Sequence, residues 1–119
     1  MGHRHSAVLV NYVIAIKLLL ALDMKPSEAL AVHRDELRRI IARHGVMRPR
    51  IFGSVVHGDD TDKSDLDLLV DATNTTTLLT LAAVQIEAER LLGVPVDVRT
   101  AQDLSKRFRD EVLNEAVPV

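Results

Sequence analysis

Apolar positions in three stretches of the chain recur every three or four residues, the spacing that places them along one face of a helix. The first of these stretches begins at Pro26 and Ser27, residues that open helices, and stops at Gly45, which favours the turn that ends one. The pattern predicts helices over residues 27–44, 77–92 and 103–115.

Three shorter stretches are rich in aliphatic residues and follow the two-residue period of strands. The predicted strands cover residues 48–53, 66–71 and 94–99. Together the segments give the order helix, strand, loop, strand, helix, strand, helix. This order predicts an α/β chain of the α+β type, with a small mixed sheet and helices packed on one of its faces.

The second and third predicted strands separate carboxylates from apolar residues, because successive side chains point to opposite faces of a sheet. Asp65 and Asp67 fall on one face, and the leucine between them falls on the other. In the third strand, Asp97 lies between Val96 and Val98 and points away from both. We therefore expect three carboxylates to gather on an open face of the sheet.

Gly53 and Ser54 end the first predicted strand, with ten residues between Ser54 and Asp65. Glycine lets the backbone approach a phosphate closely, and backbone N–H groups and the Ser54 hydroxyl can donate hydrogen bonds to it. The intervening residues are expected to form a turn and a short helix. Lys63 and Ser64 lie at the end of this intervening segment. We therefore take Gly53, Ser54, Lys63 and Ser64 as candidate nucleotide ligands.

Asp65 and Asp67 have the spacing needed to share one metal ion, since two residues span about 6.6 Å along an extended strand. Mg²⁺ suits this pair, because it is commonly held by one or two carboxylates together with phosphate oxygens and water. Asp97 would bring in a second Mg²⁺, or act as a general base, or simply be an exposed strand residue.

The composition fits one globular domain of ordinary polarity. Apolar residues make up 47% of the 119 residues and charged residues 27%, and the formal net charge is −2. A protein that holds nucleic acid through a basic surface would carry an excess of Lys and Arg, so we expect no nucleic-acid partner. The chain contains no cysteine, which excludes thiolate catalysis and disulfides and fits a cytoplasmic location.

Residues 7–22 are almost wholly apolar but are interrupted by Asn11 and Lys17. A membrane span needs roughly 20 apolar residues, so we expect no membrane segment here. We expect residues 1–23 to be an extra helix that packs on the domain or on a partner, or an extension upstream of a start at Met24. Residues 24–119 then form the functional domain.

This combination of motifs resembles the DNA polymerase beta-like nucleotidyltransferase superfamily. More narrowly, it is similar to the minimal nucleotidyltransferase (MNT) antitoxins that accompany HEPN-domain ribonuclease toxins. The resemblance rests on Gly53-Ser54, on Asp65-x-Asp67 and on Asp97 in a later apolar strand, and it covers all but the first 23 residues.

The resemblance implies an enzyme that uses two Mg²⁺ ions and ATP, transfers AMP to a tyrosine hydroxyl of the cognate HEPN toxin, and forms a hetero-oligomer with that toxin. By position, Gly53 and Ser54 would hold the triphosphate. Asp65 and Asp67 would bind Mg²⁺, and Asp97 would be the third carboxylate. The same resemblance implies the polymerase beta-like nucleotidyltransferase fold.

Val55 and Val56 depart from the family pattern, because relatives often carry an arginine directly after the Gly-Ser pair. Such an arginine would brace the triphosphate. Its absence favours an alternative, an antitoxin that inhibits its toxin by binding alone. A third interpretation, nucleotidyl transfer to a small-molecule antibiotic, fits less well, because those enzymes usually carry an added helical domain.

Overall fold

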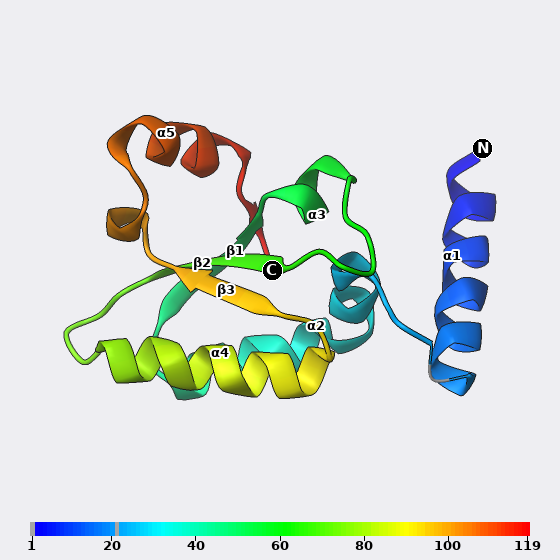
Figure 1. Cartoon of the computed structure of the whole chain (residues 1–119), viewed down its shortest axis with the longest axis horizontal. Helices are drawn as coiled ribbons and strands as arrows, with labels where there is room; N and C mark the ends of the chain where they lie inside the picture. Colours follow the sequence, from blue (N-terminus) through cyan, green and yellow to red (C-terminus); the bar gives the residue numbers. More distant parts are fainter. Residues whose placement is uncertain (1, 21) are drawn as a thin grey trace.

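The computed structural model describes residues 2–20 and 22–119, which form a four-stranded sheet flanked by helices (Figure 1). The strands are β1 (Met47–Phe52), β2 (Leu66–Asp71), β3 (Val96–Arg99) and β4 (Val117–Pro118). The α-helices are α1 (Gly2–Leu19), α2 (Pro26–Arg43), α3 (Ser54–His57), α4 (Leu78–Leu92) and α5 (Lys106–Glu115), and a 3-10 helix, η1 (Ala101–Asp103), precedes α5. Each strand and helix that the periodicity predicts is present, whereas β4 adds a strand to the expected sheet.

The sheet is mixed, as expected, and its strands lie in the order β3-β2-β1-β4. β1 pairs antiparallel with both β2 and β4, whereas β2 and β3 run parallel. A parallel pair needs a crossover connection, and α4 supplies it. The register of this pair sets Asp67 opposite Asp97 and Leu66 opposite Val96, so like residues of the two strands share a face.

The main core lies between the sheet and the helices α2 and α4, which pack on one of its faces (Figure 1). Leu66, Leu68 and Val70 point to this side and are fully buried. Leu37 of α2 and Val84 of α4 meet them and are fully buried as well. The two-residue alternation predicted for the second strand is therefore confirmed.

The opposite face of the sheet carries η1 and α5 (Figure 1). A second, smaller apolar cluster joins them to the sheet, with Phe52 of β1 and Leu69 of β2 against Leu104 and Val112. Because this cluster is small, α5 covers only part of the face. The remainder is the open surface on which the sequence places its carboxylates.

Asp60 connects the loop after α3 to the start of α2. Its Oδ2 accepts a hydrogen bond from the Ser27 backbone N–H at 2.9 Å, and the residue is only 8% exposed. Ser27 lies in the first turn of α2, where backbone N–H groups have no partner within the helix and a negative charge is favourable. Asp60 thus caps a helix that lies far from it in the sequence.

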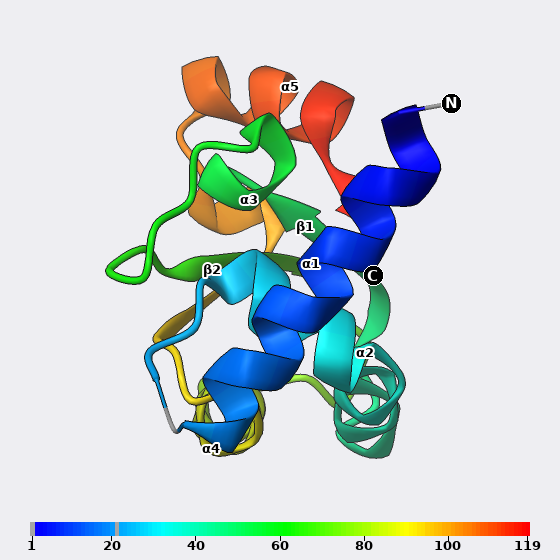
Figure 2. The same ribbon diagram turned by 90° about the vertical axis from the view of Figure 1, so that its right-hand side faces the viewer.

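Helix α1 stands at one end of the molecule, beside the start of α2 (Figures 1 and 2). Among the side chains that are described in α1, Ile14 is buried, and Lys17 Nζ lies 2.6 Å from Glu28 Oε1 in α2. Most other apolar side chains that are described in α1 are exposed. No helix within residues 2–20 and 22–119 combines the length and the hydropathy needed to cross a membrane. The division of the chain at residue 23 stays a prediction.

Candidate active site

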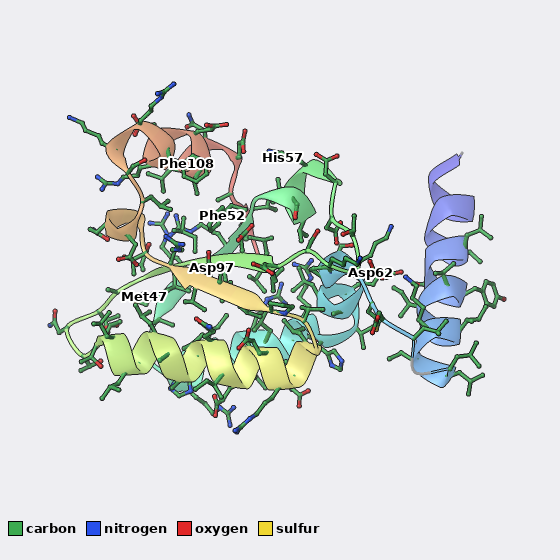
Figure 3. The ribbon with its side chains drawn as sticks, in the orientation of Figure 1. Met47, Phe52, His57, Asp62, Asp97 and Phe108 are labelled. Carbon is green, nitrogen blue, oxygen red and sulfur yellow. The ribbon has the colours of Figure 1, made fainter. Side chains whose placement is uncertain are left out.

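Asp67 and Asp97 occupy neighbouring positions on the central strand β2 and the edge strand β3. Both line one cleft on the face of the sheet that carries α5. Figure 3 labels Asp97 on this sheet. Neighbouring strands lie about 4.8 Å apart, so two carboxylates at aligned positions can reach the same ion. The structure thus confirms the expectation that Asp97 comes to Asp67 from an adjacent strand.

Gly53 brings the backbone directly against Asp67. It has a φ of 77° at the turn from β1 into α3, a conformation that other residues rarely adopt. A Cβ atom at this position would lie 2.1 Å from Asp67 Oδ2, well inside van der Waals contact. Glycine is therefore required here both for the backbone conformation and for the close approach to the carboxylate.

The environment of Asp67 opposes its ionisation. The pKa of Asp67 is raised to about 6, chiefly by burial and also by the negative charges of Asp97 and Asp65, while the positive charge of Arg99 partly offsets these effects. A carboxylate with a pKa this high near other carboxylates marks a position where a cation would relieve unfavourable charge.

Arg99 is a member of the site that the sequence analysis did not single out. Its Nε lies 3.1 Å from Oδ1 and 3.2 Å from Oδ2 of Asp97, and this pairing raises the pKa of Arg99. The strand alternation that places Asp97 on the open face places Arg99 there too, since the two are separated by one residue. That pattern could have placed Arg99 on the open face from the sequence, although not within the cleft.

The cleft around these residues has a volume of about 310 Å³, within the usual size range of small-ligand sites. Phe52 of β1 and Phe108 of α5 form apolar parts of its wall (Figure 3). His57 Nε2 lies 2.8 Å from Glu115 Oε2 and joins α3 to the end of α5 beside it. The carboxylates that line the cleft are Asp67, Asp97, Asp103, Glu111 and Glu115.

The other predicted ligands are not among the residues that line this cleft. Ser54 begins α3, directly after Gly53. Asp65 is exposed and precedes the first residue of β2. Ser64 Oγ accepts a hydrogen bond from the Thr61 N–H at 2.8 Å, in a turn that also contains the exposed Lys63. The phosphate-binding roles of these residues stay predictions.

A larger groove, of about 550 Å³, lies between α2, β1 and β4. Its floor is apolar, and it is rimmed by Arg38, Arg48 and Arg50. No Asp or Glu among the described residues lines this groove, and two of the arginines lie close to Asp71. The smaller cleft, which is lined by carboxylates, is therefore the candidate for the chemistry expected from the sequence.

The carboxylates of the cleft suit Mg²⁺ in their chemistry, because Mg²⁺ prefers hard oxygen ligands. The raised pKa of Asp67 points the same way, since a bound cation would favour its ionised form. Among the described residues, no three acidic or histidine side chains are grouped closely enough to hold a metal ion, and Asp97 is turned to Arg99. The complete set of Asp65, Asp67 and Asp97 thus stays a prediction.

The fold and the site define a class of protein. A small mixed sheet carries paired carboxylates on adjacent strands, and a glycine turn holds the backbone against one of them. This arrangement is suited to binding a phosphorylated ligand through backbone N–H groups and a divalent cation.

Comparison with known proteins defines the family. Residues 35–119 match the family model described as "Polymerase beta, Nucleotidyltransferase". A protein of Methanocaldococcus jannaschii, MJ0435, whose predicted activity is protein adenylyl transfer, is 40% identical over 89 residues, which cover 71% of this chain and 96% of that protein. Protein adenylyltransferase MntA of Thermococcus cleftensis is 37% identical over 90 residues, covering 76% of this chain and 88% of MntA. The chain therefore belongs to the polymerase beta nucleotidyltransferase family.

Solved structures give the same result. A structure described as a predicted minimal nucleotidyltransferase superposes with a TM-score of 0.71 and 43% identity, over 78% of this chain and 95% of the other. A toxin-antitoxin crystal structure with AMP-PNP superposes with a TM-score of 0.62 over 71% of this chain and 69% of the other. Because the identity in the second case is 17%, that similarity shows the fold alone. The predicted nucleotidyltransferase fold is confirmed.

Proposed function

We propose that this protein is a Mg²⁺-dependent adenylyltransferase and antitoxin, which transfers AMP from ATP to a tyrosine hydroxyl of a cognate HEPN-domain ribonuclease toxin. The observation that carries this proposal is the pairing of Asp67 with Asp97 in a cleft whose backbone, at Gly53, lies against Asp67. Relatives that are named for protein adenylyl transfer support a protein acceptor.

The residues of the proposed site divide into two groups by role. Mg²⁺, expected as two ions, would neutralise phosphate charge and polarise the phosphorus that is attacked. Its ligands would be Asp65, Asp67 and Asp97. The backbone at Gly53 would donate hydrogen bonds to the triphosphate, and so would the side chains of Ser54, Lys63 and Ser64. Most of the rate enhancement would come from positioning and from charge neutralisation.

The reaction exchanges one phosphorus–oxygen bond for another. The tyrosine oxygen attacks the α-phosphorus of ATP and forms a new bond to it. The bond from that phosphorus to the oxygen bridging the α- and β-phosphates breaks, and pyrophosphate leaves with its electrons. The hydroxyl proton would pass to Asp97 where this carboxylate acts as the general base, and to solvent water where it holds the second Mg²⁺.

The proposed partner is the HEPN toxin, in a hetero-oligomer. A toxin-antitoxin structure with AMP-PNP has the same fold as this chain, which supports both a toxin partner and ATP as the substrate. The acceptor tyrosine would be supplied by the toxin and would enter the cleft from outside. Adenylylation would then block the toxin's ribonuclease activity through the bulk and the charge of the AMP group.

The test is transfer of label from ATP that is labelled at the α-phosphate to a purified HEPN-domain toxin, the proposed partner. We expect the wild-type protein and Mg²⁺ to label the toxin and silence its ribonuclease activity. The double variant Asp65→Asn, Asp67→Asn is expected to leave the toxin unlabelled and active. A control variant, Asp110→Asn, changes an exposed carboxylate on α5 and should label the toxin normally.

One observation favours a second candidate, an antitoxin that acts by binding alone. Asp97, a proposed metal ligand, is paired with Arg99, and such pairing would keep the ion from binding. The same experiment separates the two functions. If the unlabelled toxin is inhibited equally by wild-type protein and by the double variant, binding alone is the function and transfer is not.

A further inference from the structure

The cleft is poor in positive charge for a site that would bind a triphosphate. Five carboxylates line it, and Arg99 is the one arginine or lysine among the described residues that does so. His57 also lines the cleft, but its ring lies against Glu115. A nucleotide with several phosphate charges would meet repulsion from most of the wall, and Arg99 is the fixed cation available to counter it.

Val55 and Val56 do not fill the place of a phosphate-bracing cation. Both side chains are partly buried and pack against the main core, and neither lines the cleft. An arginine side chain in place of either valine would therefore point towards the core and not into the cleft. The cation that faces the proposed phosphate site comes from the end of β3 instead.

The geometry of Arg99 leaves most of its hydrogen-bonding capacity free. Only Nε contacts Asp97, and within the described ranges neither Nη atom donates a hydrogen bond. The guanidinium has five N–H donors in a planar fork that matches phosphate oxygens. The side chain is 44% exposed, and an ion pair at this exposure is held only weakly, so the fork is free to turn.

We propose that Arg99 is the residue that braces the triphosphate, and that it exchanges Asp97 for phosphate when the nucleotide binds. Before binding, its pairing with Asp97 offsets the charge of the carboxylate. After binding, Asp97 is freed for the metal ion, and the Arg99 fork contacts the phosphates. This inference rests on the proposed nucleotidyltransferase function, and it assigns the triphosphate ligand within that site.

Two effects of opposite sign distinguish this role from a structural one. In Arg99→Gln, a non-hydrolysable ATP analogue with Mg²⁺ is expected to bind about 10- to 100-fold more weakly, because charge-assisted hydrogen bonds to phosphate are lost. AMP should lose less affinity, because it lacks the β- and γ-phosphates. Mn²⁺ without nucleotide should bind about 2- to 5-fold more tightly, because Arg99 no longer competes for Asp97.

The measurements are isothermal titration calorimetry for the nucleotides and the electron paramagnetic resonance signal of free Mn²⁺ for the metal. Arg99→Lys keeps the charge without the fork and should recover part of the affinity for the analogue. Arg90→Gln, an exposed arginine of α4 on the other side of the sheet, is the matched control and should bind all three ligands as the wild type does.

Two results would overturn the assignment. One is an Arg99→Gln variant that binds the ATP analogue as tightly as the wild type. The other is a parallel loss of analogue and Mn²⁺ binding, which would mean that Arg99 supports the site rather than contacting phosphate. A wild-type protein that binds no nucleotide would refute the proposed function itself, whereas normal nucleotide binding by Arg99→Gln refutes only the role of Arg99.

Discussion

Asp67 is expected to destabilise the metal-free protein at neutral pH. Its pKa is raised from an ordinary value of 3.8 to about 6, first by burial and then by Asp97 and Asp65. Between these two values the native state binds more protons at Asp67 than the unfolded state does. The stability contributed by protonated Asp67 is therefore complete below about pH 3.8 and is lost as the pH rises through 6.

The magnitude follows from the difference between the two pKa values. That difference corresponds to an upper limit of about 3 kcal/mol of unfolding free energy at neutral pH. Asp67 is partly exposed, and water and salt screen its repulsion from Asp97, so we expect about 1–2 kcal/mol. Asp67→Asn removes the charge and keeps the size, and should stabilise the fold by this amount.

Urea unfolding with EDTA present measures this effect. At pH 7.5 the midpoint for Asp67→Asn should lie about 0.5–1.5 M above that of the wild type. At pH 4.5 the gain in free energy should fall to about a third, because Asp67 is then largely protonated in the native state. Asp110→Asn, on the exposed surface of α5, should show neither effect. A variant that is no more stable than the wild type at pH 7.5, or whose gain does not depend on pH, would refute this reasoning.

Two further substitutions test the packing around the site. Gly53→Ala should lower the free energy of unfolding by about 2–4 kcal/mol, because the new Cβ would clash with Asp67 and alanine is also strained at a positive φ. Gly93 has a φ of 70°, and a Cβ built there would meet no atom within 4 Å. Gly93→Ala should therefore lower the free energy of unfolding by only about 1–2 kcal/mol in the same urea titration. Equal losses in the two variants would show that the close approach to Asp67 contributes nothing. Asp60→Ala should cost about 1 kcal/mol and speed amide hydrogen exchange at the start of α2, where it caps the helix; unchanged exchange at Ser27 would contradict the capping role.

The sequence could predict those parts of the site whose positions follow from the two-residue alternation of side chains along a strand. Alternation along β2 and β3 placed Asp67 and Asp97 on one face, and the register of the parallel pair then set them side by side. The same alternation applies to Arg99, but a lone arginine at a strand end carries no sign of what it faces. Its position became clear only when η1 and α5 were seen to close the cleft around it.

Contacts between distant segments were beyond the reach of sequence patterns. Asp60 lies in an acidic loop that suggests a solvated surface, yet it caps α2 across 33 positions of the chain. The two valines after the glycine turn suggested a missing cation, yet they pack against the core. In both cases the contacts of these side chains depend on how the loop after β1 folds back over the sheet. No local spacing of residues specifies the path of that loop.

Intact-mass spectrometry of the proposed HEPN partner is the direct test of whether this chain transfers AMP to a tyrosine of a toxin. After incubation with this chain, ATP and Mg²⁺, the toxin should gain the mass of one or more adenylyl groups, and fragmentation should map each group to a tyrosine. The Asp65→Asn, Asp67→Asn variant should leave the mass unchanged. A toxin that is silenced without any gain in mass, or that is modified equally by the variant, would contradict the account.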